Sequence, residues 1–335
     1  MMEDAFLPDW THHGGRLSSA MRAFPDAPQP WLDLSTGINP DPWNGIAGLE
    51  IDWRRLPDEA DLDRLERVAA AHFGVDSARV LALPGTEMGL RSLATLGLPT
   101  PYRHVAPGYR THGEALPGSR AIAFDTLHRT DADGGALLLA NPANPDGRLT
   151  DMVEMMALVG RWTGNGGWML VDEAFIDAHD TGSILPRIAA DARIIVLRSF
   201  GKFFGLAGVR LGFAVGPVDM IATWRTAMGS WPLSAAAIAI GSAAYADTAW
   251  IAATRIQLAE RAAALDAVLA RHGLTPIGQS PLFRLIDCDA AALFDRLAQR
   301  GVLTRPFDYA PRWLRLGVPS DGDALDRLDR ALGGG

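Results

Sequence analysis

Short apolar runs alternate along the chain with segments whose apolar residues recur at helical spacing. The apolar runs occupy residues 80–83, 136–140, 168–171 and 194–197, and polar or glycine-rich residues follow each run directly. Buried strands that alternate with helices are typical of a mostly parallel sheet covered by helices. The pattern therefore predicts an α/β fold for the middle of the chain.

The polar segments after these runs are the candidate ligand-binding segments. In an open parallel sheet, ligands bind beyond the carboxyl ends of the strands. We therefore expect the four junctions to form one crevice, and we expect Thr150 to cap the helix that follows the second of them. The segments are residues 84–87, 141–147, 172–173 and 198–199.

The pattern changes at about residue 235. A long alanine-rich helical region follows and ends at Gly273, because glycine is a common stop at the end of a helix. Two short strands and two helices are expected after it, which together indicate a smaller α+β domain. These elements are residues 282–286 and 314–317 for the strands, and 290–300 and 323–332 for the helices.

The chain is therefore expected to form three parts. Residues 1–42 are rich in proline and are expected to be an extended arm that contributes to the small domain and to a substrate site. Residues 43–234 are expected to form a large domain, and residues 235–335 the small C-terminal α+β domain. The apolar stretch at residues 233–245 is too short and too rich in small residues to span a bilayer, which favours a buried helix.

Composition narrows the class of protein and its partners. The 335 residues are 48% hydrophobic and 21% charged, which is typical of a globular protein. The net charge of −8 and the lack of a basic run argue against nucleic acid or a membrane as partner. The single Cys288 excludes an internal disulfide and favours the cytoplasm. No secretion signal and no metal site are expected.

Lysine occurs once in this chain. The 31 basic residues are Lys202 and otherwise arginines. Arginine does not lose its proton near neutral pH, whereas a lysine amine can approach neutrality and form a Schiff base with an aldehyde or ketone. Either amine chemistry is needed at this position, or a base-composition bias replaced the other lysines by arginine.

Residues suited to the ring of pyridoxal phosphate follow the predicted strands. This cofactor needs an amine for its aldehyde, a carboxylate for its pyridine nitrogen, a donor near its ring oxygen and a flat face for stacking. Lys202 can supply the amine and Asp172 the carboxylate. Asn144 can donate to the ring oxygen, and Tyr109 offers the stacking face.

A phosphate cup is expected at the start of the helix that follows the first predicted strand. Gly85, Thr86 and Glu87 open this helix, where free backbone N–H groups and the helix dipole suit a phosphate. Ser199 and Arg210 can add side-chain contacts. Each signal is weak alone, and the prediction of this cofactor rests on their occurring together.

Three segments resemble a known family. Residues 141–147 read NPANPDG, residues 172–175 read DEAF, and residues 199–210 read SFGKFFGLAGVR. They resemble the fold type I pyridoxal-phosphate aminotransferases of the histidinol-phosphate branch. Residues 13–16 (HGGR) and 34–40 (LSTGINP), with the Ser-Phe-Gly-Lys form of the lysine motif, make the whole chain similar to the threonine-phosphate decarboxylases of cobalamin synthesis.

The resemblance implies a fold and a reaction. The fold is a mostly parallel seven-stranded sheet sandwiched by helices in a cofactor-binding large domain, and the assembly is a homodimer. The reaction is decarboxylation of L-threonine O-3-phosphate to (R)-1-amino-2-propanol phosphate, with Lys202, Asp172 and Tyr109 as catalytic residues. A histidinol-phosphate-type aminotransferase that uses 2-oxoglutarate and glutamate stays open as the alternative. A non-catalytic regulator that keeps the fold as a binding module is a third.

An amino acid phosphate carries two anions, and planar guanidinium groups suit both. By resemblance, Arg315 binds the substrate carboxylate and Arg305 the substrate phosphate. The arm residues are expected to complete the phosphate end and to order on binding. The other residues expected at the substrate are His13, Gly14, Arg16, Gly37 and Asn39.

The chain departs from the family pattern at two positions. Phe175 stands where the family has a tyrosine whose hydroxyl reaches the ring oxygen, so Asn144 is expected to carry that role alone. Leu56 stands where the family often has a tyrosine that reaches the cofactor phosphate of the neighbouring subunit. Leucine cannot make that hydrogen bond, so this cross-subunit contact is not expected.

Overall fold

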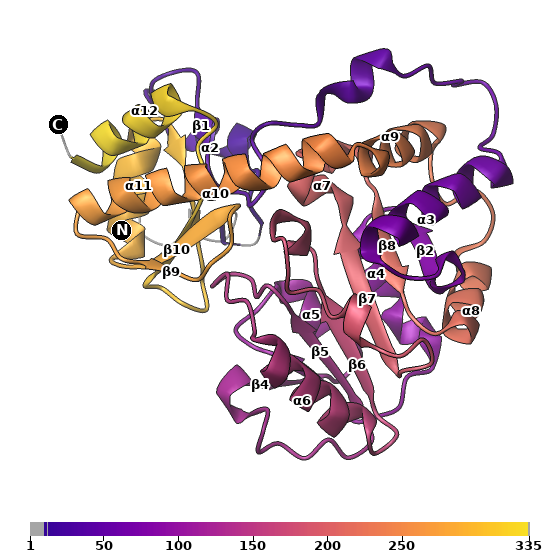
Figure 1. Ribbon diagram of the computed structural model, residues 1–335. Coiled ribbons are helices and arrows are strands. Elements are labelled where there is room, and N and C mark those ends of the chain that lie inside the picture. Colours follow the sequence, from indigo (N-terminus) through magenta and orange to yellow (C-terminus); the bar gives the residue numbers. More distant parts are fainter. Residues whose placement is uncertain (1–9, 12, 334–335) are drawn as a thin grey trace. The chain divides into compact units, whose positions relative to one another are not determined.

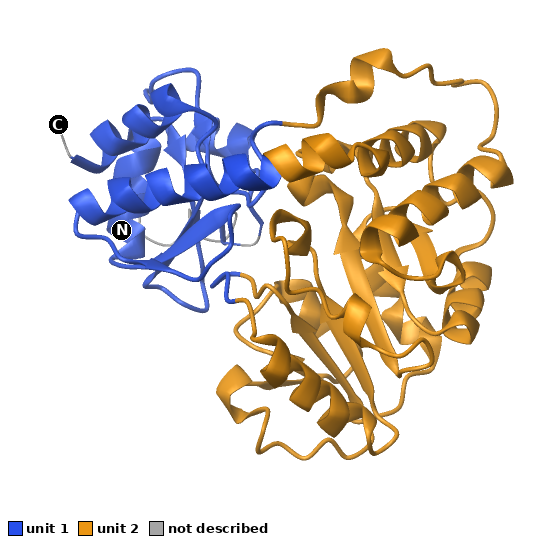
Figure 2. Ribbon diagram, viewed as in Figure 1, with its two compact units in different colours: residues 1–41, 145–148, 254–335 blue, residues 42–144, 149–253 orange. Residues whose placement is uncertain are grey.

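The structure, a computed structural model, describes residues 10–11 and 13–333 (Figure 1). The chain divides into two compact units, drawn in different colours in Figure 2. We call residues 42–144 and 149–253 the large unit. Residues 1–41, 145–148 and 254–335 form the small unit. The first nine residues of the expected arm, where no secretion signal was expected, lie outside the described residues.

Seven strands form the sheet of the large unit, in the order β2-β8-β7-β6-β5-β3-β4. Strands β3 to β7 pair in parallel, and β8 lies antiparallel between β2 and β7. The predicted α/β fold with a mostly parallel seven-stranded sheet is therefore confirmed. The strands are β2 (Val80–Leu83), β3 (Tyr102–Val105), β4 (Arg120–Ile122), β5 (Ala136–Ala140), β6 (Trp168–Asp172), β7 (Ile194–Ser199) and β8 (Gly212–Val215).

The central strands are buried along their whole length. Every residue of β2, β7 and β8 is buried. Strands covered on both faces read as continuous apolar runs, which is the pattern that the sequence shows. Helices flank the sheet (Figure 1). They are α3 (Glu59–Phe73), α4 (Thr86–Ser92), α5 (Arg110–Ala115), α6 (Met152–Thr163), α7 (Phe200–Phe203), α8 (Val218–Met228) and α9 (Ala235–Ala246).

The cap of α6 differs from the expected one. Asp151, not Thr150, is the capping residue, and its carboxylate accepts hydrogen bonds from the backbone N–H groups of Val153 and Glu154. A carboxylate serves well here because it also interacts favourably with the positive end of the helix dipole. Thr150 instead donates its backbone N–H to Oδ1 of Asn141, at 2.9 Å. The expectation for Thr150 was wrong by one residue.

Helix α9 packs closely on α3. Most of its residues are buried, as its small and apolar composition predicted. At Gly241 an added Cβ would lie 2.9 Å from Leu65 of α3 and 2.4 Å from Leu211, so a larger side chain would force the helices apart. Over the described residues, no single helix is long and apolar enough to cross a membrane. Helix α9 and α10 (Thr248–Arg271) pass that test only as a pair with a 77° bend.

The small unit contains two short sheets. Strands β12-β13-β10-β9 form an antiparallel sheet, and β1 pairs in parallel with β11. The helices of this unit are α2 (Leu17–Ala23), α11 (Ala290–Gln299), α12 (Gly322–Gly333) and the later part of α10. The strands are β1 (Leu32–Asp33), β9 (Pro276–Ile277), β10 (Phe283–Asp287), β11 (Val302–Leu303), β12 (Arg305–Pro306) and β13 (Trp313–Gly317).

The observed division of the chain differs from the expected one. The units separate between residues 253 and 254, inside α10, and not at residue 235, because α9 packs on α3 of the large unit. Residues 145–148 join the small unit, where the carbonyl of Gly147 accepts the backbone N–H of Gln279 at 2.9 Å. The N-terminal segment is not wholly extended, since it contains α2 and contributes β1 to the small unit.

Candidate active site

Lys202 lies on α7, directly after the carboxyl end of β7. Aromatic side chains hold this helix in place, since Phe200 is fully buried and stacks on Phe204 with ring centroids 4.6 Å apart. The Lys202 Nζ lies 5.8 Å from the centroid of the Phe175 ring. Phe175 follows β6, so the amine lies beside the segment that ends the neighbouring strand.

Asp172 ends β6 and is 6% exposed. Its Oδ1 accepts the backbone N–H of Ala174 at 3.0 Å, and its Oδ2 lies 2.9 Å from Nε2 of His112. His112 is 1% exposed and was not among the predicted site residues. A signal for it exists in the sequence, because it lies only three residues after Tyr109, in the first turn of the helix that Tyr109 precedes. The two rings meet edge-on at 5.7 Å.

Asn144 and Tyr109 belong to neighbouring strand ends. At Gly108 an added Cβ would lie 2.8 Å from the backbone oxygen of Val105, and at an ordinary contact distance of 3.9 Å from the backbone oxygen of Asn144 and from Nδ1 of His112. Glycine therefore lets the chain turn closely past the end of β3, and the segment before Tyr109 lies near both Asn144 and His112. The Tyr109 hydroxyl donates to Oε2 of Glu87 at 2.9 Å. Burial and the nearby Glu87 carboxylate raise the pKa of Tyr109 to about 12, so the phenol keeps its proton.

The side chain of Glu87 faces protein groups. Its carboxylate accepts hydrogen bonds from Tyr109, from Thr111 at 3.0 and 3.1 Å, and from Arg91 at 2.9 Å. A carboxylate repels a phosphate, so the side chain is suited to orienting Tyr109. Its backbone N–H in the first turn of α4 is the group that can face an anion.

The residues predicted for a phosphate come together at the start of α4. Gly85 has φ +88°, and an added Cβ there would lie 2.6 Å from a guanidinium nitrogen of Arg210. At Gly212 of β8, an added Cβ would lie 2.7 Å from the backbone nitrogen of Thr86. Gly212 is also the cross-strand partner of Ser199. The donor set at this point is therefore backbone N–H, hydroxyl and guanidinium, which suits a phosphate.

The large unit thus fits the cofactor expected from the sequence. It holds an amine, a buried carboxylate and a phosphate cradle whose space depends on two glycines. Within the described part of the chain, no group of three or more His, Cys, Asp or Glu side chains could hold a metal ion.

In the small unit, Arg305 and Arg315 lie directly opposite each other on β12 and β13. They are 7% and 3% exposed. Burial and the neighbouring Arg305 hold the pKa of Arg315 well below its usual range. Two buried guanidinium groups side by side repel each other, and an anion bound between or beside them relieves that repulsion. The arrangement therefore favours an anionic ligand.

Aromatic rings and the N-terminal segment orient these arginines. The guanidinium carbon of Arg315 lies 5.0 Å from the Phe283 ring, and one of its nitrogens donates to the carbonyl of Ser35 at 3.1 Å. Gly14 lies against the same carbonyl, where an added Cβ would approach to 2.3 Å. The backbone N–H of Gly15 donates to Oγ of Ser35 at 2.7 Å. The structure thus brings the segment of Gly14 to Arg315.

The remaining predicted substrate residues differ in exposure. Asn39 is 2% exposed and its Oδ1 accepts the backbone N–H of Asp41 at 3.0 Å. Gly37 is buried, His13 is partly buried, and Arg16 is exposed just before α2.

Comparison with known proteins identifies the family. The sequence model of aminotransferase class I and II matches residues 120–332. This chain belongs to that family. A threonine-phosphate decarboxylase from Sinorhizobium sp. is 40% identical over 327 residues, covering 96% of this chain and 97% of the relative. One from Pseudomonas aeruginosa is 40% identical over 325 residues, covering 96% of each. The histidinol-phosphate aminotransferase 2 of Burkholderia mallei is 30% identical over 302 residues, covering 83% and 82%.

Solved structures of this family share the fold. A histidinol-phosphate aminotransferase from Sinorhizobium meliloti in complex with pyridoxal-5'-phosphate matches with a TM-score of 0.81 at 21% identity, covering 94% of this chain and 93% of that one. An L-threonine-O-3-phosphate decarboxylase from Porphyromonas gingivalis matches with a TM-score of 0.77 at 18% identity, covering 90% and 98%. At these identities the likeness establishes the fold type I architecture.

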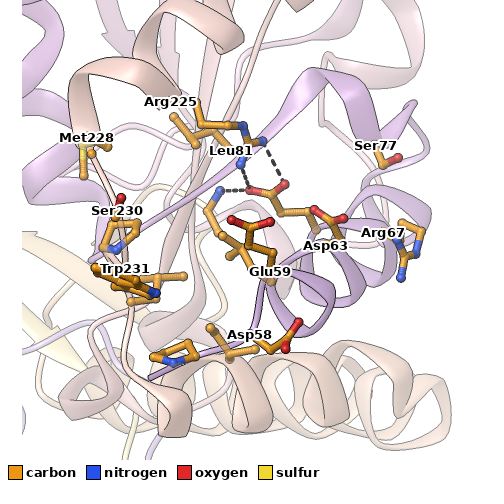
Figure 3. A pocket seen from close by; sticks show the side chains of 18 of the residues that line it. Asp58, Glu59, Asp63, Arg67, Ser77, Leu81, Arg225, Met228, Ser230 and Trp231 are labelled. Carbon is orange, nitrogen blue, oxygen red and sulfur yellow. Dashed lines mark hydrogen bonds and ion pairs between the residues drawn. The ribbon is translucent and has the colours of Figure 1, made fainter. Parts of the chain in front are cut away.

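A hollow of about 620 Å³ in the large unit lies apart from the residues predicted for the family's cofactor, none of which lines it (Figure 3). Glu66 and Arg225 form an ion pair in it, with N···O distances of 3.0 and 2.8 Å. Burial raises the pKa of Glu66, although Arg225 lowers it. Trp231 also lines the hollow and is 60% exposed.

Proposed function

We propose that this chain is a pyridoxal-phosphate-dependent carboxy-lyase that converts L-threonine O-3-phosphate to (R)-1-amino-2-propanol phosphate and carbon dioxide, for cobalamin synthesis in the cytoplasm. The observation that carries the proposal is 40% identity over 96% of the chain with relatives named threonine-phosphate decarboxylase. The relatives named histidinol-phosphate aminotransferase are 27% to 32% identical and cover 70% to 83% of the chain. The assignment of L-threonine O-3-phosphate as the substrate rests on that difference in identity and coverage.

The large unit supplies the residues that hold the cofactor. Bound pyridoxal phosphate withdraws electrons from the Cα of an amino acid joined to it, so that a bond at Cα can break. Lys202 binds the aldehyde, and Asp172 keeps a proton on the pyridine nitrogen. His112 orients that carboxylate through the contact at 2.9 Å. The phosphate is bound by Ser199, Arg210 and the backbone at the start of α4.

Two further residues are proposed to contact the cofactor ring, one at its face and one at its edge. Tyr109 stacks on the ring, and its hydrogen bond to Glu87 fixes the tilt of the phenol. Asn144 donates to the ring oxygen and does so alone, because Phe175 has no hydroxyl. Phe175 instead offers an aromatic face to the Lys202 amine.

The substrate is held through its two anions. Arg315 binds the carboxylate and Arg305 the phosphate. Bound pyridoxal phosphate would accept the electron pair of the bond between Cα and the carboxylate carbon, so that this carbon would leave as carbon dioxide. The Lys202 amine holds the proton that is delivered to Cα. His13, Gly14, Arg16, Gly37 and Asn39 complete the substrate site.

The active protein is proposed to be a homodimer. Leu56 and Trp231 are 66% and 60% exposed, and they line two hollows of the large unit that share Pro57, Asp58 and Ile238. The family resemblance favours a second copy of this chain as the partner that covers this surface. Light scattering after size-exclusion chromatography is expected to give twice the chain mass for the wild type and one chain mass for Leu56→Arg. Val153→Arg, at an 80% exposed position on α6, is the control, and a monomeric wild type would refute the dimer.

Release of carbon dioxide tests the reaction. The purified protein, with pyridoxal phosphate and L-threonine O-3-phosphate but no oxo acid, is expected to release carbon dioxide over many turnovers. A strict need for 2-oxoglutarate, with formation of glutamate, would instead establish the aminotransferase alternative. Absence of cofactor binding at any concentration would support the binding-module alternative.

A further inference from the structure

Beside the candidate cofactor residues, the large unit contains a buried network of charges that the proposed chemistry does not use. Arg198, on β7, is 4% exposed and precedes Ser199 directly. Glu173, which follows Asp172 directly, is fully buried. Asp177, in the short 3-10 helix η5 (Ile176–Ala178), is 3% exposed. Burying ionised groups is costly unless they pair, so this cluster needs a reason.

Arg198 is the centre of the network. One guanidinium nitrogen donates to Oε2 of Glu173 at 3.4 Å, and another donates to Oδ1 of Asp177 in a short contact. The guanidinium carbon lies 4.4 Å from the centroid of the Phe73 ring. Glu173 also accepts hydrogen bonds from the Ser183 hydroxyl at 2.7 Å and from the Ile184 backbone at 2.8 Å. The bonds of Arg198 thus tie β7 to the segment that follows β6.

Groups from two helices complete the network. His72, in the last turn of α3, places Nε2 3.0 Å from Oδ1 of Asp177. The Tyr245 ring, from α9, lies 5.1 Å from the His72 ring and 4.9 Å from that of Phe204, just after the helix of Lys202. The charged and titratable groups that face Arg198 are therefore Glu173, Asp177, His72 and Tyr245.

The charges of the two carboxylates differ. Burial raises the pKa of Glu173 to about 7, although Arg198 opposes the rise. Burial also acts on Asp177, but Arg198 and His72 overcome it and hold its pKa at about 2. Asp177 is therefore the permanent counterion of Arg198. Glu173 is the weaker partner.

The geometry of the strands places this network behind the candidate site. Side chains alternate between the faces of a sheet, so Glu173 and Arg198 point to the face opposite Asp172 and Ser199. The register pairs Asp172 with Leu197, which makes Glu173 and Arg198 neighbours at the ends of β6 and β7. These two strand ends carry the carboxylate and the lysine segment. Their relative position sets the distance between Asp172 and Lys202.

From this geometry we infer that Arg198 is a positioning residue, which fixes the carboxylate of Asp172 relative to the amine of Lys202 through its bonds to Glu173 and Asp177. The inference rests on the proposed use of pyridoxal phosphate. It assigns Arg198 no contact with cofactor or substrate. Small displacements of reacting groups have large effects on rate, so loss of the bonds acts on catalysis more than on substrate binding.

Arg198→Lys and Asp177→Asn are the test variants. Lysine keeps the charge but lacks the fork that reaches two carboxylates at once. Asparagine keeps the shape of Asp177 and removes its charge. In the holoenzyme we expect kcat to fall about tenfold or more, with KM changed less than about twofold. We also expect the pH midpoint of the visible absorbance of the bound cofactor to shift, because that midpoint reports the surroundings of Lys202.

Asp266→Asn is the matched control, because Asp266 forms a comparable two-bond ion pair, at 2.6 and 2.9 Å, with Arg284 of the small unit, which is 7% exposed and has no proposed role in the site. It is expected to lower the Tm without moving the absorbance midpoint or kcat. Test variants that lower the Tm in the same way, with an unchanged midpoint and unchanged kcat, would overturn the inference. Arg198→Met is not a suitable variant, because it leaves two buried carboxylates without their cation and is therefore expected to destabilise the fold.

The outcomes separate this inference from the proposed function. If the wild-type protein binds the cofactor but requires an oxo acid, the proposed decarboxylase activity is overturned. The Arg198 variants can still be tested in that case, because the absorbance of the bound cofactor is measured without substrate. A wild-type protein with no cofactor absorbance would overturn both.

Discussion

The imidazole of His112 lies 2.9 Å from the carboxylate of Asp172, and both side chains are buried. The contact joins α5, which begins just after Tyr109, to the end of β6. Through this contact, the helix that follows Tyr109, the residue proposed to stack on the cofactor ring, is joined to Asp172, the residue proposed to bind the pyridine nitrogen. Residues that orient a reactive carboxylate in this way contribute through position and not through contact with the substrate.

The first prediction concerns this contact. His112→Ala removes the partner of Asp172 Oδ2 and leaves the carboxylate oriented by the Ala174 backbone N–H at Oδ1, so kcat is expected to fall about tenfold or more. Steady-state kinetics and the visible spectrum of the bound cofactor measure the effect. His104→Ala is the control, because His104 is partly buried and lies 2.9 Å from the Ser119 hydroxyl. Equal effects of both substitutions would contradict the role of His112.

The second prediction follows from the single lysine. Lys202→Ala is expected to abolish turnover and the absorbance of covalently bound cofactor, because no other lysine can replace it. Borohydride reduction of the wild-type holoenzyme followed by peptide mass spectrometry should place the cofactor on Lys202. Labelling of the N-terminal amine alone would refute the assignment, and so would full activity of the variant.

The third prediction concerns the phosphate cradle. Gly85→Ala places a Cβ against Arg210 at a residue with φ +88°, so the dissociation constant for pyridoxal phosphate is expected to rise. Gly97→Ala is the control, since Gly97 has φ +65° and nothing within 4 Å of the added Cβ. Gly97→Ala carries the αL strain of about 1 to 2 kcal/mol. Gly85→Ala carries strain of about 1 to 3 kcal/mol, because Gly85, with φ +88° and ψ 153°, lies in a region that essentially only glycine adopts. Only Gly85→Ala should lose cofactor affinity, as measured by fluorescence titration.

The fourth prediction separates the two buried arginines. Arg315→Ala is expected to lower kcat/KM for all substrates, because each carries a carboxylate. Arg305→Ala is expected to lower kcat/KM more for phosphorylated analogues than for unphosphorylated ones. Ratios of kcat/KM for L-threonine O-3-phosphate and L-threonine give the comparison. Inorganic phosphate should also raise the Tm of the wild type by binding the folded state, and should do so less in Arg305→Ala. Identical analogue ratios in the two variants would contradict this division.

The fifth prediction is a pH dependence of stability. The folded-state pKa of Glu173, about 7, lies above the ordinary value of 4.5, so the folded protein retains a proton that the unfolded chain releases. The stabilisation from Glu173 is therefore complete below about pH 4.5 and is lost as the pH rises to about 7. Denaturant unfolding should show wild type losing stability relative to Glu173→Gln across that interval. A constant difference would refute the raised pKa.

The opposite sign holds for Asp177. Its folded-state pKa, about 2, lies below the ordinary value of 3.8, so its contribution is present above that value and is lost as the pH falls towards about 2. Asp177→Asn should therefore lose its disadvantage relative to wild type in acid, in the same unfolding experiments.

Most of the sheet was predictable because its strands are buried on both faces. The runs at β2, β5, β6 and β7 differ from the expected bounds by at most two residues, since continuous apolar runs mark such strands without regard to their neighbours. Helix caps and domain boundaries were harder to predict from the sequence. Whether Thr150 or Asp151 caps α6, and whether α9 belongs to the large unit, depends on packing partners distant in sequence, such as Leu65 for Gly241.

The sequence by itself determined the type of fold, the family and the set of chemical groups, because Lys202, Asp172 and the glycine-rich segments stand directly after recognisable strands. Only the tertiary structure decided which groups touch. It placed His112 on Asp172 and Glu87 on Tyr109, and it set Arg198 between two carboxylates behind the strand ends. These contacts join residues 21 to 60 positions apart, and strand register, which local sequence does not encode, brings them within hydrogen-bonding distance.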